Sequence, residues 1–223
     1  MIACENLQGY WNRIRQPCAR SQTAHNASVE DRTMSRASSI DAARVVAETR
    51  AWIEKAVIGL NLCPFARSVY ADERIRYRVS ESRTQDALAI DLETELRALQ
   101  AADPQVCETT LLIHPHLLTD FFEYNAYLDV VDALVESVGL RGEIQIASFH
   151  PRYQFAGSQA GDIENYTNRS PYPMLHLLRE ASVERAVAGL TDPALVYERN
   201  IETLRRLGHR GWQKLWTDED AGG

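Results

Sequence analysis

Residues 109–116 read TTLLIHPH, and residues 144–151 read IQIASFHP. Each stretch is a short apolar run that ends in a His-Pro pair. Because proline has no backbone N–H to donate to a sheet ladder, it marks the end of a strand. The first run shows no clean alternation, which is typical of a strand covered on both faces. The two stretches therefore predict strands, the first of them buried, with His114 and His150 at their carboxyl ends.

Helical periodicity lies on both sides of these strands. Apolar residues recur every three or four positions over residues 40–60, 84–100 and 119–139. This spacing places them on one face, as in an amphipathic helix that packs on a core. The sequence therefore predicts three helices that alternate with the strands.

The remaining segments complete the predicted fold. Residues 74–80 alternate with a period of two, which predicts a half-exposed edge strand. Ser-Pro and Asp-Pro pairs predict two C-terminal helices, over residues 170–189 and 192–208. Strands separated by helices imply parallel neighbours with right-handed crossovers. We expect an α/β fold with a small, mainly parallel sheet of about three strands, crossover helices and two C-terminal helices.

The two ends of the chain differ from the part between them. Residues 1–38 are rich in polar side chains and have no sustained period, which predicts a disordered extension. We interpret Met34, just before the periodic sequence, as the natural start. Residues 39–210 then form a single α/β domain, and residues 211–223 form a short C-terminal tail with an acidic end.

Composition limits the class of protein. The 223 residues carry a net charge of −7 and no Lys/Arg run longer than two, which argues against a nucleic-acid partner. No stretch approaches the roughly 20 apolar residues of a membrane span. The 4 cysteines form no CxxC pair, and no export signal precedes them. We therefore expect a cytoplasmic protein with reduced thiols and no membrane partner.

Histidines gather where the chain leaves the predicted strands. In open α/β sheets, ligands bind beyond the carboxyl ends of the strands, where His114 and His150 fall. His116 lies two residues further on, and His176 shares a predicted helix face with Glu180. Such imidazoles can hold zinc or iron, or move protons near neutral pH. A metal there could activate water for hydrolysis, or bind oxygen or a carbonyl.

Cys63 is a third candidate catalytic residue. It lies at the end of the first predicted helix, directly before Pro64, which cannot continue that helix. A helix C-terminus does not favour a thiolate, so its reactivity needs a nearby cation or base. His150 or His114 could supply that base. A buried, inert thiol is the alternative.

The long polar loop after His150 predicts a binding site for an anion. Arginine binds carboxylate and phosphate through paired hydrogen bonds, and this loop places two arginines among amides and tyrosines. We expect Arg169 to lie beside the N-terminus of the helix that begins at Ser170, where an anion is favoured. The candidate substrate-binding residues are Arg152, Tyr153, Asn168, Arg169 and Tyr172.

Several longer motifs resemble a bacterial family catalogued as domain of unknown function 1415. The motifs are LNLCPFA (60–66), TLLIHP (110–115), QIASFHPRYQFA (145–156), NYTNRSPYP (165–173) and LHLLRE (175–180). The resemblance covers residues 40–207 and implies a single domain. The family has no established reaction, so it implies no catalytic residues.

Three functions agree with these patterns. The first is an enzyme acting on a small anionic metabolite in a cleft lined by histidines, with or without a transition metal. The second is a metal-free thiol enzyme that uses Cys63 with His114 or His150. The third is a non-enzymatic module that uses the polar loop to bind a ligand or a partner.

Overall fold

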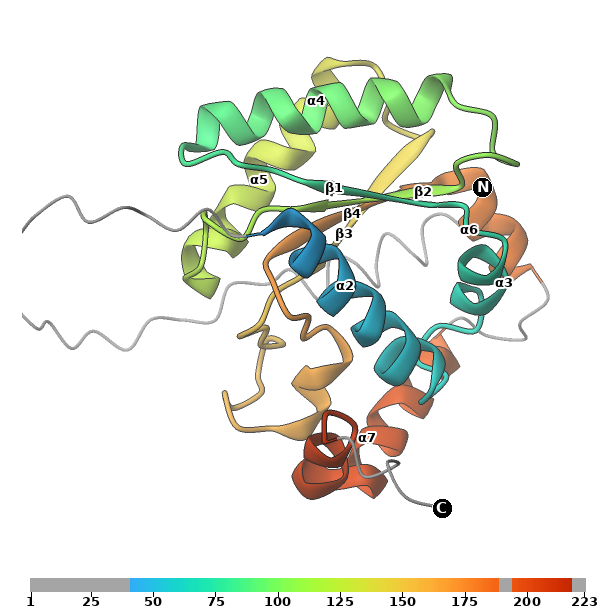
Figure 1. Ribbon diagram of the computed structural model, residues 1–223, viewed down its shortest axis with the longest axis vertical. Helices are drawn as coiled ribbons and strands as arrows, with labels where there is room; N and C mark the ends of the chain where they lie inside the picture. The colour runs from blue at the N-terminus through green and yellow to red at the C-terminus, as the bar shows by residue number, and fades with distance from the viewer. Residues whose placement is uncertain (1–40, 189–193, 218–223) are drawn as a thin grey trace, which may run out of the picture.

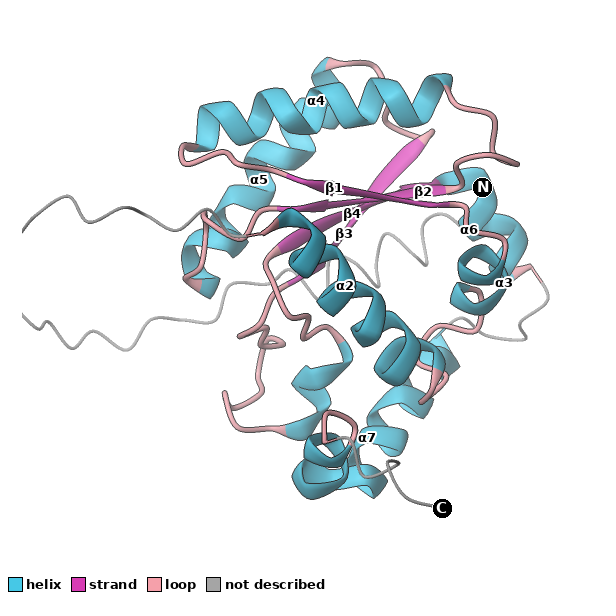
Figure 2. Ribbon diagram, in the orientation of Figure 1, coloured by secondary structure: helices cyan, strands magenta, loops and turns pink. Residues whose placement is uncertain are grey.

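The computed structural model describes residues 41–188 and 194–217. The predictions for residues 1–38 and for most of the acidic tail therefore lie outside the described residues. Within them, helices cover both faces of one sheet (Figures 1 and 2). In chain order the elements are α2 (Ala42–Trp52), the π-helix η1 (Ile53–Ile58), α3 (Ala66–Ala71), β1 (Ile75–Val79), α4 (Gln85–Ala101), β2 (Thr109–Ile113), α5 (Phe121–Ser137), β3 (Ile144–Phe149), the 3-10 helix η2 (Ile163–Thr167), β4 (Met174–Arg179), α6 (Glu180–Val187) and α7 (Ala194–Lys214).

The sheet has four strands in the order β1-β2-β4-β3. β1 pairs with β2 in parallel, at the edge where the sequence predicted it, and β4 pairs antiparallel with both β2 and β3. The predicted α/β class is therefore confirmed. The prediction of about three strands in a mainly parallel sheet is wrong, because β4 reverses the direction in the middle of the sheet.

β4 was predicted as part of the helix over residues 170–189. Its sequence, MLHLLR, is a short apolar run, and such a run is compatible with a buried strand or a buried helix. The helical sequence of α6 follows at Glu180 without a turn residue between them, so the pattern reads as one helix. Hydrogen bonding to two strands decides the conformation, because β4 is paired along both edges.

The predicted helices over residues 84–100 and 119–139 are α4 and α5. The Thr84 hydroxyl accepts a hydrogen bond from the Ala87 amide and caps α4. The Asp120 carboxylate accepts hydrogen bonds from the Phe122 and Glu123 amides and caps the start of α5. The predicted first helix is α2 continued by the π-helix η1, and the short helix α3 was not predicted.

α7 continues past the point where the predicted domain ends. Gly208 has φ +65° and kinks the helix, and the chain resumes helical geometry as far as Lys214. Trp212 is 9% exposed and packs in the core. A glycine was expected to stop the helix, because Gly in the left-handed region commonly follows a helix end. Here the residues beyond it still bury an aromatic side chain, so they belong to the fold.

Two hydrophobic clusters lie on opposite faces of the sheet. The first joins α4 and α5 to Leu112, Leu175 and Leu177. The second joins α2, η1 and α7 to Leu111, Ile113 and Met174. Figure 1 shows α4 above the sheet and α2 and α7 below it. None of the helices in the described ranges is both long enough and apolar enough to cross a membrane.

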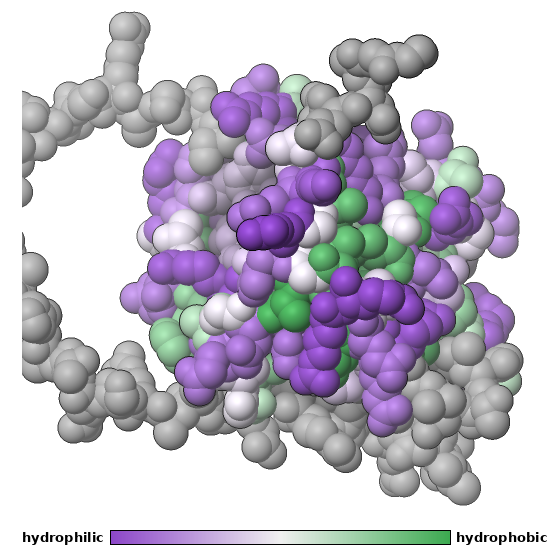
Figure 3. Space-filling model, turned by 90° about the horizontal axis from the view of Figure 1, so that it is seen from below, coloured by the Kyte–Doolittle hydropathy of each residue, from purple (hydrophilic) through white to green (hydrophobic). Residues whose placement is uncertain are grey.

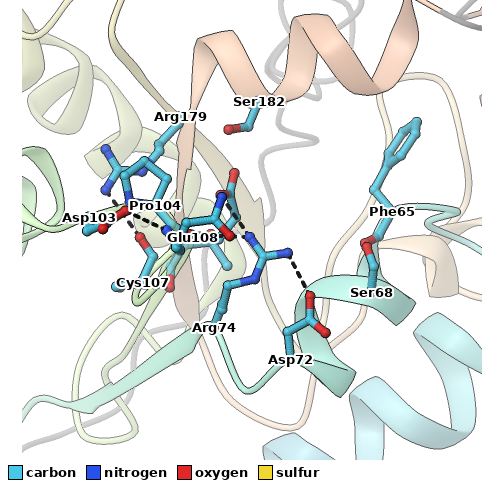
Figure 4. Close-up of polar contacts among 12 residues, drawn as sticks. Phe65, Ser68, Asp72, Arg74, Asp103, Pro104, Cys107, Glu108, Arg179 and Ser182 are labelled. Atoms are coloured by element: carbon cyan, nitrogen blue, oxygen red, sulfur yellow. Dashed lines mark hydrogen bonds and ion pairs between the residues drawn. The ribbon is translucent and has the colours of Figure 1, made fainter.

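Two arginines hold the loop between α4 and β2. Arg179 donates to the carbonyls of Leu99, Ala102 and Cys107, which satisfies groups left free at the end of α4. Arg74 bonds to Glu108 and Asp72, as Figure 4 shows. These contacts tie the amino ends of β1 and β2 to the start of α6, away from the edge of the sheet where the histidines lie.

Candidate functional site

His114 and His150 lie at the same edge of the sheet. β2 and β3 both run antiparallel to β4, so their carboxyl ends point the same way. The His114 amide donates to the Pro173 carbonyl, and the His150 amide donates to that of Asn168. β4 separates the two strands, however, so the histidines do not follow adjacent strands.

Tyr124 of α5 contacts both imidazoles. Its ring centroid lies 5.8 Å from that of His114 and 5.1 Å from that of His150. Its hydroxyl donates to the Met174 carbonyl at 2.8 Å and accepts from the Phe149 amide at 3.1 Å. The phenol therefore joins the ends of β3 and β4 and packs against both rings.

Burial keeps both imidazoles neutral at physiological pH. Loss of solvent lowers the pKa of His114 and that of His150 to about 4. His150 Nε2 donates to the Leu118 carbonyl, and its Nδ1 accepts from the Arg152 amide. His114 Nδ1 donates to the Leu117 carbonyl, which makes Nε2 an acceptor. That Nε2 is buried and has no hydrogen-bond partner among the described residues.

The other two predicted metal ligands lie elsewhere. His116 Nε2 is 3.3 Å from the Glu81 carboxylate. His176 is on β4, not on a helix, and its side chain is on the opposite face of the sheet from His114. Its Nε2 lies 2.8 Å from the Thr109 hydroxyl, and burial lowers its pKa to about 4. Within residues 41–188 and 194–217, no three His, Cys, Asp or Glu side chains are grouped to hold a metal.

The Arg169 side chain holds two parts of the polar loop together through hydrogen bonds to backbone carbonyls. Its guanidinium donates to the carbonyls of Tyr153 and Ala160 and lies 4.3 Å from the Tyr166 ring centroid. The helix expected to begin at Ser170 is not formed, because the next element is the strand β4. The helix terminus that motivated an anion site at Arg169 is therefore absent there.

The other predicted substrate-binding residues also contact protein groups. Asn168 donates to the Ser148 carbonyl, and Tyr172 donates to the Glu48 carboxylate at 2.6 Å. Tyr153 is 2% exposed and packs in the core. The Arg152 guanidinium donates to the Thr119 carbonyl and is largely exposed. Together these side chains fasten the loop to α2, α5 and β3, and their role toward a ligand stays a prediction.

Cys63 lies between η1 and α3, near the start of α7. Burial raises the pKa of its thiol, although the amides of Phe65 and Ala66 and the charge of Arg199 all favour the thiolate. The adjacent Leu62 packs in the cluster that contains α2 and α7, and Tyr124, which both histidines contact, packs in the other cluster. The structure therefore does not bring Cys63 together with His114 or His150.

A hollow of about 540 Å³ lies next to this segment, between the end of η1 and α7. Its lining combines backbone, polar and apolar groups from two distant parts of the chain. The lining residues are Gly59, Leu60, Asn61, Arg199, Thr203, Arg206 and Leu207. None of these residues is among the candidates that the sequence motifs indicated. Arg199, Thr203 and Arg206 are spaced i, i+4 and i+7 on the predicted last helix, which was the available signal.

The charges at this hollow are incompletely paired. Arg199 donates to the Asn61 carbonyl at 3.1 Å. Arg206 has no hydrogen bond or ion pair to any residue in the described ranges, whereas the adjacent Arg205 pairs with Glu164 at 2.9 Å. Two guanidiniums thus line one hollow, and no described carboxylate neutralises them.

Gly59 is required by the backbone that forms one wall. A Cβ atom at this position would lie 2.3 Å from the Lys55 carbonyl oxygen and 3.2 Å from that of Glu54. The close approach follows from the wider turn of η1, where the Gly59 amide donates to the Glu54 carbonyl five residues earlier. The geometry of the π-helix therefore determines the position of Leu60 and Asn61 relative to α7.

The comparisons with known proteins agree with the resemblance in the sequence. A family model described as a protein of unknown function, domain of unknown function 1415, matches residues 44–214. The chain therefore belongs to this family. Neither curated proteins nor solved structures gave a match.

We expect Cys63 to react slowly with iodoacetamide at pH 7, with a pH–rate midpoint above that of a free thiol, because burial disfavours the thiolate. Arg199→Gln should raise the midpoint further, since the Arg199 charge favours the thiolate. Arg210→Gln, an exposed change on the same helix, should leave it unchanged. Peptide-resolved mass spectrometry of Cys63 alkylation from pH 7 to 10 measures this pH–rate midpoint. A midpoint below that of a free thiol would contradict it.

Proposed function

We propose that this protein binds a small anionic molecule in the hollow between η1 and α7. The observation that carries the proposal is the Arg206 guanidinium, which lines the hollow beside Arg199 and has no partner among the described residues. The ligand class is the one expected from the sequence. The place is different, because the side chains predicted around Arg169 bond to protein groups.

Electrostatics and hydrogen bonding both favour an anion here. Two guanidiniums near each other repel, and an anion between them removes that repulsion. Arginine presents a planar set of donors that matches a carboxylate or a phosphate. Thr203 and Asn61 add a hydroxyl and an amide to the same lining. The site therefore has a charge and a donor set complementary to an oxyanion.

The proposal predicts that phosphate, sulfate or short carboxylates stabilise the folded protein. Arg206→Gln should weaken the tightest of these ligands about ten- to hundredfold, as expected for the loss of a charge-assisted hydrogen bond. Arg210→Gln makes the same change in charge on an exposed position of α7 and should retain full affinity. Isothermal titration calorimetry, supported by thermal shifts, measures both variants. Equal losses of anion affinity in the two variants would show that the effect comes from net charge alone. If the wild type binds none of these anions, the proposal is wrong.

The enzyme expected at the carboxyl edge of the sheet stays a separate prediction. Its strongest support is the unpartnered Nε2 of His114, which is a free acceptor close to His150 and Tyr124. The absence of a group of three ligands in the described residues gives the metal-dependent form of this prediction no support.

A further inference from the structure

We infer that the ligand of the η1–α7 hollow is an amphiphilic monoanion, with one carboxylate or phosphate group attached to an aliphatic chain. This inference rests on the proposed function and names the substrate class for the same site. It follows from three features of the hollow, which are its apolar lining, its one guanidinium without a partner among the described residues, and its size.

Leucines complete the lining around the two arginines. Leu60 and Leu207 line the hollow, and both are only half-buried. Both also pack against the cluster beneath them, so the apolar part of the lining is continuous with the core. Figure 3 shows the molecule from below, the side on which α7 lies in Figure 1, and there hydrophobic surface is exposed among hydrophilic side chains. An inorganic anion would leave this apolar surface in contact with water.

Of the two described guanidiniums that line the hollow, Arg206 is the one with no hydrogen bond or ion pair to another described residue. Arg199 already donates to the Asn61 carbonyl, which fixes the end of η1 against α7. Arg206 alone has no partner among the described residues, and Leu207 follows it directly. One free guanidinium beside leucine side chains matches one charged group attached to an apolar chain. A ligand with a charge at each end would instead place its second charge against the leucines.

The size of the hollow supports a ligand larger than an inorganic ion. Its volume of about 540 Å³ lies within the range of roughly 300–1,000 Å³ that is typical of small-molecule sites. A tetrahedral oxyanion occupies only a few times the roughly 30 Å³ of one water molecule. The remaining space accommodates a chain of several carbons against Leu60 and Leu207.

The test is a series of ligands of increasing length on the full chain. We expect affinity to rise from butyrate through hexanoate to octanoate, by up to about fourfold for each methylene that becomes buried. Octanedioate, which has the length of octanoate but a carboxylate at both ends, should bind more weakly than octanoate. Calorimetry below the micelle concentration of each ligand gives the affinities.

Two substitutions test separately the contribution of the ligand's aliphatic chain and that of its charged group. Leu60→Ser should abolish the gain with length while butyrate binding is retained, and Arg206→Gln should weaken all three monocarboxylates by a similar factor. Circular dichroism confirms that each variant is folded, and the wild-type series is decisive by itself if one is not.

Each unfavourable result has a distinct meaning. If phosphate or butyrate binds and affinity does not rise with length, the amphiphilic ligand is wrong and the proposed function survives. Tighter binding of octanedioate than of octanoate also overturns the inference, in favour of a two-headed anion. Full octanoate affinity in Arg206→Gln would show binding to apolar surface elsewhere and overturn it as well. If no anion binds to the wild type, the proposed function and this inference both fail.

Discussion

Lowering the pH from 7 to 5 is expected to remove a large part of the stability of the fold. His114, His150 and His176 each have a pKa of about 4 in the folded protein, against an ordinary value of 6.5. The unfolded chain therefore binds more protons between these limits, so stability is complete above pH 6.5 and falls as the pH drops toward 4. At pH 5 the loss is roughly 2 kcal/mol for each histidine, against a total of about 5–15 kcal/mol for a typical domain.

The pH window distinguishes these histidines from the carboxylates. Glu48 and Glu164 have lowered pKa values because of their hydrogen bonds to Tyr172 and Arg205, so their contribution is lost only below about pH 4.5. Urea unfolding at pH 7, 6 and 5 measures the loss, and NMR titration of the imidazoles assigns it. His114→Gln removes one of the three buried imidazoles and should make the loss of stability between pH 7 and 5 smaller than in the wild type. A constant unfolding free energy between pH 7 and 5, or a His114 that titrates near 6.5, would contradict the prediction.

Gly59→Ala is expected to destabilise the protein by about 1–3 kcal/mol, because the new methyl group would lie 2.3 Å from the Lys55 carbonyl oxygen. Helix propensity alone predicts the opposite sign, since alanine is better than glycine by up to about 1 kcal/mol in a helix. The clash is with backbone, so it is relieved only if η1 shifts. We therefore expect anion affinity at the hollow to fall together with stability.

Gly161→Ala is the matched control for this substitution. Gly161 is exposed, a Cβ atom there meets nothing within 4 Å, and its φ is not in the left-handed region. It should change the unfolding free energy by less than about 0.5 kcal/mol. Urea unfolding of the two variants at pH 7.5, each with and without phosphate, gives both readouts. Equal stability of Gly59→Ala and the wild type would show that η1 does not need a glycine at this position.

The sequence predicts the elements with a long, consistent period and misses those that depend on pairing. α4 and α5 each repeat leucines or aromatics over three or more turns, and β2 and β3 end in His-Pro pairs. β4 has only six residues, and its apolar run has no period of its own. The strand forms because two neighbours pair with it. Its direction makes the sheet mixed instead of parallel, and its register places His176 on the opposite face from His114.

In the candidate sites too, features with a local sequence signal are predicted and features that depend on long-range contacts are missed. The sequence predicts that His114 and His150 follow strands, because a His-Pro pair is a local signal. It does not predict that Tyr124 contacts both rings, since that contact depends on where α5 crosses the sheet. The hollow joins residues 59–61 to residues 199–207, through bonds such as that from Arg199 to the Asn61 carbonyl. The helical spacing of Arg199, Thr203 and Arg206 marks one wall of the hollow, but a contact over 138 residues leaves no local pattern that joins the two segments.

The position of β4 in the sheet also determines when the nascent chain can fold. β4 is the last of the described strands to leave the ribosome, and it fills the place between β2 and β3. Until it emerges, β3 has no neighbour in the sheet and β2 has an open edge, and such edges can pair with other chains. The sheet can therefore be completed only after residues 174–179 have left the ribosome, later than the other three described strands.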